Sequence, residues 1–253
     1  MICFPHAKIN LGLNIISKRP DGYHNLETVF YPVTEIQDAL EIVPAQDEKG
    51  IFRQSGIAID GNPSDNLVMK AYRLLAEKYP LPELDVYLYK NIPFGAGLGG
   101  GSADAAFMLN LLNNYAQLNI PASELEELAA QIGADCAFFV QSKPVFATGI
   151  GNVFEPVNLS LDAYQISIVK PEVHVSTKDA YANIVPQQPK ISLKEIIQLP
   201  VEEWKHTMVN DFEESVFSKY PQIQTVKEDM YQQGALYASM SGSGSAVFGI
   251  FKK

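Results

Sequence analysis

The sequence predicts a mixed α/β protein, because stretches with strand periodicity and stretches with helix periodicity alternate along it. Near the start, Ile9 to Ile15 place an apolar residue at every second position, as β-strands do. In the middle, Ala105, Ala106, Leu109 and Leu112 fall on one helical face. At the end, two apolar stretches enclose the Gly/Ser loop Ser241–Ser245, which indicates two further strands.

The composition indicates a globular protein with a substantial core. The 253 residues are 47% hydrophobic and 19% charged, which suits one large domain or two modest ones. The net charge of −10 argues against a nucleic-acid or anionic-membrane surface, whose phosphates it would repel. An anionic ligand would therefore need local groups to hold it.

Cysteine usage and hydropathy predict the compartment. Cys3 and Cys136 form no C-x-x-C pair, and so few cysteines suggest a reducing environment. The histidines are scattered, without metal-ligand spacing. No apolar run is long enough to span a membrane, and the first residues lack a signal-peptide core. We expect a cytoplasmic protein with no nucleic-acid partner and no membrane contact.

In the first half, strand patterns and helix signals follow one another. The expected strands are Ala7–Ile16, Leu26–Val33, Ala39–Val43, Ile51–Ile59 and Leu84–Lys90. After the break at residues 61–66, a helix should run from Leu67 to about Tyr79, capped by Ser64 or Asp65. A second helix should begin with Ser102 as its cap. Ser123 and Glu126 form a capping box for a third helix, which Gly133 ends.

The second half begins at about residue 158. It should contain a strand at Tyr164–Lys170, a short helix capped by Ser176 or Thr177, and helices at Leu193–Gln198, Glu202–Lys219 and Gln222–Gln233. Gly234 would close the last helix. The final strands should be Ala235–Met240 and Ala246–Phe251.

The stretch from Ile92 to Ala106 carries the strongest chemical signal. Its five glycines within seven residues let backbone N–H groups turn inward without Cβ clashes, and the following helix start adds partial positive charge. These features predict a phosphate-binding loop. The candidate binding residues are Pro93, Gly95, Ala96, Gly97, Leu98, Gly99, Gly100, Gly101, Ser102 and Ala103. A flexible linker is the alternative, but linkers do not usually join an apolar strand to a capped helix.

The familiar classes of phosphate loop do not fit this stretch. Gly95, Gly97 and Gly100 match G-x-G-x-x-G, which alone is weak. A dinucleotide fold would need an acidic residue about twenty positions later, at the end of a second strand, and none is there. No Gly-Lys-Ser/Thr follows as in Walker loops, and the Val-Ala-Ile-Lys and His-Arg-Asp segments of protein kinases are missing. A phosphate loop of another class is left.

Several polar positions have both an ordinary and a functional interpretation. Lys8, Asn10 and Asn14 share one face of the first strand, which is either a solvated edge or, with Gly12 between them, a place of close approach to the backbone. Tyr23 and His24 follow a turn and either pack or bind a ring. Asp135, between the helix stop and an apolar run, is either a cap or a catalytic carboxylate. The loop Ser241–Ser245 is either an ordinary hairpin or lies against a phosphate or the glycine-rich loop.

Three of these stretches, in this order, resemble the motifs of the GHMP kinases, the family of galactokinase, homoserine kinase and mevalonate kinase. They are Lys8–Leu11, Pro93–Ala106 and Ser241–Phe248. Further matching segments are Arg19–His24, Gly133–Asp135 and Asn210–Glu213. The resemblance covers nearly the whole chain, although His6 stands where a proline is common and the second half is short.

The resemblance implies a two-domain GHMP kinase fold of the α/β (α+β) class. Residues 1–157 would form a ribosomal-protein-S5-like N-terminal domain that holds the ATP phosphate loop. Residues 158–253 would form a ferredoxin-like C-terminal domain, with the active site in the cleft between the domains. We expect a monomer or a weak homodimer.

The resemblance also implies an activity, namely transfer of the ATP γ-phosphate to the 2-hydroxyl of 4-diphosphocytidyl-2-C-methyl-D-erythritol, in the non-mevalonate route to isoprenoids. Asp135 would be the general base, and Lys8 the cation that offsets developing charge. Mg²⁺ would be held largely by phosphate oxygens, with Ser102 as a candidate ligand. The cytidylyl substrate would be bound by Asn10, Tyr23, His24 and Tyr181.

Two alternatives stay open. One is another small-molecule kinase of the same fold, of the homoserine or mevalonate type, whose substrates carry no base to stack on Tyr23 and His24. The other is a nucleotide-binding module without turnover, which the presence of both Lys8 and Asp135 disfavours.

Overall fold

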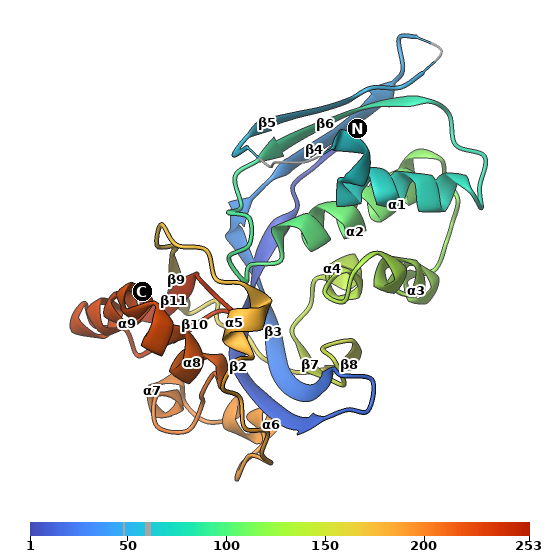
Figure 1. The fold of residues 1–253 in the computed structure, drawn as a ribbon. Coiled ribbons are helices and arrows are strands. Elements are labelled where there is room, and N and C mark those ends of the chain that lie inside the picture. The colour runs from blue at the N-terminus through green and yellow to red at the C-terminus, as the bar shows by residue number, and fades with distance from the viewer. Residues whose placement is uncertain (48, 59–61) are drawn as a thin grey trace. The chain divides into compact units, whose positions relative to one another are not determined.

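The structure is a computed structural model that describes residues 1–47, 49–58 and 62–253 (Figure 1). Its strands are β1 Ile2–Cys3, β2 His6–Lys18, β3 His24–Gln37, β4 Ala39–Pro44, β5 Phe52–Gly56, β6 Leu84–Lys90, β7 Val145–Thr148, β8 Val153–Pro156, β9 Tyr164–Val169, β10 Tyr237–Met240 and β11 Val247–Lys252. Its α-helices are α1 Leu67–Ala76, α2 Gly100–Tyr115, α3 Ala122–Ile132, α4 Cys136–Gln141, α5 Thr177–Ala180, α6 Leu193–Ile196, α7 Val201–Trp204, α8 Phe212–Lys219 and α9 Pro221–Gln232, and a 3₁₀ turn, η1, covers Pro63–Asp65. The predicted mixed α/β class is confirmed.

The chain forms two compact units, each built from segments that are not consecutive. Unit 1 consists of Met1–Ala7, Val33–Phe94 and Gly99–Lys143, and unit 2 of Lys8–Pro32, Gly95–Leu98 and Pro144–Lys253. The glycine-rich loop therefore passes from unit 2 into unit 1 after Leu98. The predicted domain division after residue 157 stays a prediction.

Unit 1 is a sheet covered by helices. Its strand order is β1-β4-β6-β5, with β4 antiparallel and β5 parallel to β6. Alternate residues of the central strands, such as Leu40 and Leu88, are fully buried, and α1 and α2 lie along one face of the sheet (Figure 1). Strand β6 occupies the predicted residues and leads directly into the glycine-rich loop.

Unit 2 contains a sheet of order β10-β11-β9 and most of a sheet of order β2-β3-β7-β8. Its core joins Leu13 and Ile15 of β2 to Phe212 and Val216 of α8 and to Met240 of β10. These residues are far apart in the sequence but pack together in the core. As a result, β2 is buried along most of its length.

Two predicted helix caps in unit 1 are wrong. Ser64 and Asp65 lie inside η1, and the side chain of Asn66 instead caps α1 by accepting a hydrogen bond from the Val68 N–H at 2.9 Å. Helix α3 starts directly after Pro121, whose extended backbone places Ser123 inside the first turn with no capping bond. The end of α3 at Gly133 and the Ser176 cap of α5 are as predicted.

The predicted helix Glu202–Lys219 is also wrong, because it is two helices, α7 and α8. Between them the chain pairs with β2: the Leu13 N–H donates to Val209 O, and the Asp211 N–H donates to Leu13 O, both at 2.8 Å. The Asp211 carboxylate accepts the Ile15 N–H at 2.6 Å. A continuous helix would have needed these backbone groups for its own bonds.

Some elements differ from, or were missing in, the sequence prediction. The β7–β8 hairpin and α4 carry no strong periodic signal because each is short. The predicted strand Ile51–Ile59 is β5, Phe52–Gly56; Ile59 and Gly61 lie outside the described residues. In the described part of the chain, no helix has the length and apolarity to cross a bilayer.

Candidate active site

The glycine-rich loop has the backbone that the sequence predicts. Gly95, Gly97 and Gly99 have φ angles of +63°, +77° and +71°, which side chains with a Cβ rarely adopt. Helix α2 begins at Gly100 without a side-chain capping bond, so its first N–H groups are available to an anion. The prediction that Ser102 caps this helix is therefore wrong, because Ser102 lies inside the first turn.

Lys8 and Asn10 are buried polar residues of β2, with only 3% of each exposed. The Lys8 ammonium donates to Asn10 Oδ1 at 2.5 Å and lies 4.9 Å from the centre of the Phe30 ring. Asn10 Nδ2 donates to Thr28 Oγ1 at 3.0 Å. The interpretation of this face as a solvated edge is wrong, because unit 2 encloses it and fixes both side chains.

The close approach expected at Gly12 comes from the protein itself. A Cβ at this position would overlap the side chain of Leu193 and lie 3.0 Å from Met208 Cγ. Nearby, Asn14 Nδ2 donates to Glu27 Oε1 at 3.0 Å, and the same oxygen accepts the Leu193 N–H at 3.0 Å. Gly12 and Asn14 thus hold α6 against β2 and are structural.

The C-terminal Gly/Ser loop lies against the glycine-rich loop. Ser241 Oγ accepts the Asn10 N–H at 3.2 Å and donates to Gly97 O at 2.9 Å. The Ala246 N–H donates to Ala96 O at 3.1 Å. Within unit 2, the three sequence stretches that were singled out independently therefore meet around one hydroxyl group.

Asn210 fixes the position of the Gly/Ser loop, a role that the sequence did not reveal. Its Nδ2 donates to Met240 O and to Gly242 O, each at 2.8 Å, and its Oδ1 accepts the Phe212 N–H at 3.0 Å. The available signals were the resemblance of Asn210–Glu213 to a family segment and the Asn-Asp pair inside a predicted helix, since both residues are poor helix formers.

Two of the three predicted aromatic site residues come together. The rings of His24 and Tyr181 are stacked, with centroids 4.9 Å apart and planes at 24°. Phe212 supports Tyr181 edge-on at 4.7 Å. Tyr23 is not part of this stack: it is 63% exposed, and its N–H donates to Asp21 Oδ1.

Asp135 lies in the turn between α3 and α4. It occupies the N-cap position of α4, but its side chain makes no capping hydrogen bond to that helix. A Cβ on Gly133 would lie 3.2 Å from Cys136 Sγ and 4.0 Å from Ser102 Oγ, which places this turn beside the start of α2. Burial raises the pKa of the Cys136 thiol to about 11, and a hydrogen bond with Ser102 partly opposes the rise.

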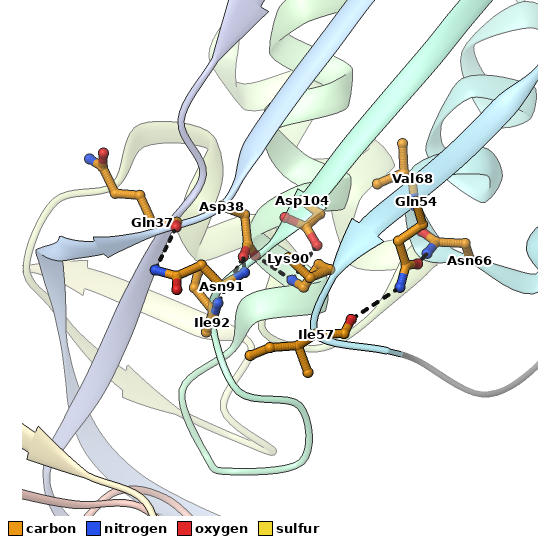
Figure 2. A network of polar contacts seen from close by, with 10 residues as sticks. All are labelled: Gln37, Asp38, Gln54, Ile57, Asn66, Val68, Lys90, Asn91, Ile92 and Asp104. Atoms are coloured by element: carbon orange, nitrogen blue, oxygen red, sulfur yellow. Dashed lines mark hydrogen bonds and ion pairs between the residues drawn. The ribbon is translucent and has the colours of Figure 1, made fainter.

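Unit 1 also has a pocket of about 670 Å³ next to the start of α2. Apolar side chains, amide groups and two carboxyl groups line it: Phe52, Gln54, Ala58, Asn62, Pro63, Asp65, Asn66, Leu67, Phe94, Gly101 and Asp104. Gln54 and Asn66 are joined by a hydrogen bond of 3.3 Å (Figure 2). This lining suits a flat heterocycle with polar edges.

A buried charge cluster, Lys90 with Asp38 and Asp104, lies at the base of the loop in unit 1 (Figure 2). This cluster was not predicted, although Lys90 and Asp104 flank the glycines in the sequence and were a visible signal. Burial raises the pKa of Asp104 to about 8, and the Lys90 ammonium opposes the rise. Over residues 1–47, 49–58 and 62–253, no group of three or more His, Cys, Asp or Glu side chains is placed to hold a metal ion.

Comparisons with known proteins agree with this geometry. Residues 66–143 match the family description "GHMP kinases N terminal domain", and residues 192–253 match "GHMP kinases C terminal". A Bacteroides fragilis protein named 4-diphosphocytidyl-2-C-methyl-D-erythritol kinase is 61% identical over 99% of this chain and 92% of its own length. A Chlorobium limicola protein of the same name is 42% identical over 98% of this chain and 87% of its own length.

Solved structures show the same similarity. A crystal structure of 4-(cytidine 5'-diphospho)-2C-methyl-D-erythritol kinase matches with a TM-score of 0.85 and 31% identity, over 99% of this chain and 90% of the other. The homoserine kinase from Cytophaga hutchinsonii matches with a TM-score of 0.70 and 18% identity, over 98% of this chain and 85% of the other. The second similarity concerns the fold alone.

The contact between Gly97 and Ser241 leads to a first prediction. Gly97→Ala should destabilise the protein, because the new Cβ would overlap Ser241 O at a backbone φ of +77°. Gly234→Ala is the matched control, since Gly234 has a φ of +95° but open space around it. We expect the control to lose about 1–2 kcal/mol and Gly97→Ala about 1–3 kcal/mol more. Urea unfolding measures both, and equal losses would contradict the close packing of the two loops.

The raised pKa of Asp104 leads to a second prediction. Because the folded protein holds this proton up to about pH 8 while the unfolded value is 3.8, wild type should lose stability as the pH rises between these values. Asp104→Asn carries no titrating group, so its stability relative to wild type should increase from about pH 5 to about pH 9. Asp179→Asn is the control: the Lys219, Ser176 and Tyr220 side chains lower the pKa of Asp179 to about 2, so this carboxylate stays ionised throughout that range. Urea unfolding at several pH values tests this, and a flat difference for Asp104→Asn would refute it.

Proposed function

Because the chain belongs to the GHMP kinase family, it is a kinase, and we propose that it transfers the γ-phosphate of ATP to the 2-hydroxyl of 4-diphosphocytidyl-2-C-methyl-D-erythritol. The predicted two-domain GHMP kinase fold is confirmed by the same family matches and by the solved structures. The observation that carries the proposal is the meeting of Asn10, Gly97 and Ser241 in unit 2, together with relatives that are named for this substrate.

ATP use follows from the family, and its placement is part of the proposal. The positive-φ glycines and the uncapped start of α2 would receive the phosphates through backbone N–H groups. The neighbouring pocket would take the base, with Phe52 and Phe94 against its faces and the amides of Gln54 and Asn66 at its edge. Apart from the buried Leu98, the loop residues 95–101 are glycines and one alanine, which supports this fit because the backbone itself would supply the donors.

Mg²⁺ is also part of the proposal. Phosphate oxygens would hold most of its coordination shell, and the Ser102 hydroxyl in the first turn of α2 is the candidate protein ligand. This division suits a site without a carboxylate cluster among the described residues. When bound, the ion would neutralise charge on the transferring phosphate.

We assign the proton transfer to Asp135 and charge compensation to Lys8. An alcohol is a weak nucleophile until a base shares its proton, and Asp135 is the carboxylate of the family-like segment Gly133–Asp135, in the turn before α4. Lys8 is held by Asn10 and Phe30 in one orientation, so its charge is positioned before reaction and needs no reorganisation. Asn10 would position the substrate beside Lys8, which it holds by a hydrogen bond.

The cytidylyl group is assigned to the stack of His24 and Tyr181. A pyrimidine ring can stack on such a pair while the imidazole hydrogen-bonds its edge. Tyr23, the residue before His24 in the chain, is exposed and would close over the bound ring. A small-molecule acceptor, action in the cytoplasm and a monomeric or weakly dimeric state remain parts of the proposal.

The function is tested by ADP release with a panel of acceptors. We expect turnover with 4-diphosphocytidyl-2-C-methyl-D-erythritol and a kcat/KM on the order of 100-fold or more below it for homoserine, mevalonate and galactose, which carry no base for the aromatic stack. Comparable turnover with homoserine or mevalonate would favour a kinase of that type. ATP binding without turnover on any acceptor would favour a binding module.

The role of Asp135 is tested by Asp135→Asn, which keeps the shape of the side chain but cannot accept the proton. We expect kcat to fall by about 10²–10⁴, with the affinities for both substrates nearly unchanged. Asp229→Asn, the same change on an exposed position of α9, should leave kcat unaltered. An Asp135→Asn enzyme that keeps more than about a third of wild-type kcat would show that another group handles the proton.

A further inference from the structure

The buried cluster of Lys90, Asp38 and Asp104 is the most polar part of the interior of unit 1. The three residues are 2%, 1% and 2% exposed. The Lys90 ammonium lies between the two carboxylates: it is bonded to Asp38 Oδ2 and donates to Asp104 Oδ2 at 2.6 Å (Figure 2). Every member comes from a different segment, since Asp38 lies between β3 and β4, Lys90 ends β6, and Asp104 belongs to α2.

The cluster joins the two ends of the glycine-rich loop. Asp38 Oδ1 accepts the N–H groups of Asn91 and Ile92 at 2.6 and 2.8 Å, which fixes the chain just before the loop (Figure 2). Asp104 lies in α2, four residues after its first residue, and is tied to the same cluster through Lys90. Entry to the loop and exit from it are thus held by one set of charges.

The start of α2 is seated directly on this cluster. A Cβ at Gly100 would lie 2.8 Å from Ile92 Cγ2 and 3.3 Å from Lys90 Nζ. Glycine is therefore required here by the protein interior, and the helix end cannot shift toward β6. The position of the first N–H groups of α2 depends on Lys90 and Ile92 beneath them.

Such a cluster is a poor choice for stability alone. Buried ion pairs can often be replaced by apolar side chains of similar volume with no loss of stability, because removing charges from water is costly. Here a single ammonium serves two buried carboxyl groups, and Asp104 Oδ1 has no hydrogen-bond partner. A role in fixing geometry accounts for a feature that stability does not explain.

We propose that Lys90, Asp38 and Asp104 are positioning residues of the phosphate loop, which set its affinity for the triphosphate of the nucleotide without touching it. The proposal rests on the assignment of the loop to the ATP phosphates. Backbone donors bind an anion well only if they are held in place beforehand, because a mobile loop loses conformational freedom on binding. Releasing either end of the loop therefore weakens phosphate binding while the helix and the sheet remain.

The test compares variants of the cluster by calorimetry, with ATP and inorganic tripolyphosphate as probes. Asp104→Leu and Lys90→Met each remove the link between α2 and β6 and fill the space with apolar atoms. The double variant removes both partners. Asn110→Leu is the matched control: Asn110 Nδ2 donates to Val140 O at 3.0 Å, so this change removes a different side-chain tether of α2, remote from the loop. Thermal unfolding followed by circular dichroism confirms that each variant is folded.

We expect each single variant to bind ATP and tripolyphosphate about 10- to 100-fold more weakly, the scale known for residues that orient direct ligand contacts. The double variant should bind the probes no more weakly than the weaker-binding single variant, because both changes break the same link between Lys90 and Asp104. Asn110→Leu should bind both probes as wild type does. In kinetics, KM for ATP should rise while KM for the acceptor stays unchanged.

Several results would overturn the proposal. Unchanged tripolyphosphate binding with weaker ATP binding would show that Asp104 acts on the base pocket that it lines. Equal losses in Asn110→Leu would show a general effect of destabilising α2. Because both probes bind without an acceptor, the result is independent of whether 4-diphosphocytidyl-2-C-methyl-D-erythritol is the substrate; wild type that bound neither probe would contradict the ATP assignment as well.

Discussion

The hydroxyl group of Ser241 is the contact on which the arrangement of the site in unit 2 depends. It is fully buried, accepts the N–H of Asn10 and donates to the carbonyl of Gly97. Lys8 is oriented by Asn10, the glycine-rich loop is held by Gly97, and Asn210 holds the loop that carries the serine. Three segments that are far apart in the sequence are thereby fixed relative to one another by short polar contacts. Glycine is required at position 97 because a Cβ there would occupy the space of the Ser241 carbonyl oxygen.

Because the whole chain is acidic, the proposed function requires local groups to hold its anionic ligands. A net charge of −10 provides no general attraction for ATP or for a cytidylyl diphosphate. In unit 1, backbone N–H groups at the uncapped start of α2 supply localised positive potential. In unit 2, the buried ammonium of Lys8 is a charge held in place by Asn10. The proposed binding of anionic ligands therefore depends on local geometry. Buried polar side chains hold this geometry in each unit: Asn10 and Asn210 in unit 2, and Lys90 in unit 1. Their hydrogen bonds are directed at backbone atoms and at each other, and they hold the donors in place.

The sequence predicted what local pattern and local chemistry determine. The alternation in β2 and β6, the glycine-rich loop and the Gly/Ser loop all follow from periodicity or from backbone freedom, and so do their bounds to within a few residues. Contacts between distant segments were not accessible in this way. The break between α7 and α8 arises because residues 209–211 pair with β2, and the burial of Lys8 arises because unit 2 covers its face. Helix caps were wrong where a neighbouring residue, such as Asn66, competed for the same role. The Lys90 cluster was only partly visible in the sequence: Lys90 and Asp104 flank the glycines, but the contact with Asp38 depends on the fold.

The central claim is that the γ-phosphate of ATP is transferred to one hydroxyl of a cytidylyl substrate. The most direct test is ³¹P NMR of the product formed from ATP and 4-diphosphocytidyl-2-C-methyl-D-erythritol. The account predicts one new phosphomonoester resonance on the 2-oxygen of the methylerythritol unit, formed in equal amount to ADP, while the two resonances of the cytidylyl diphosphate persist. ADP formed without a phosphorylated acceptor, or a new resonance from phosphate added at the diphosphate or the ribose, would contradict it.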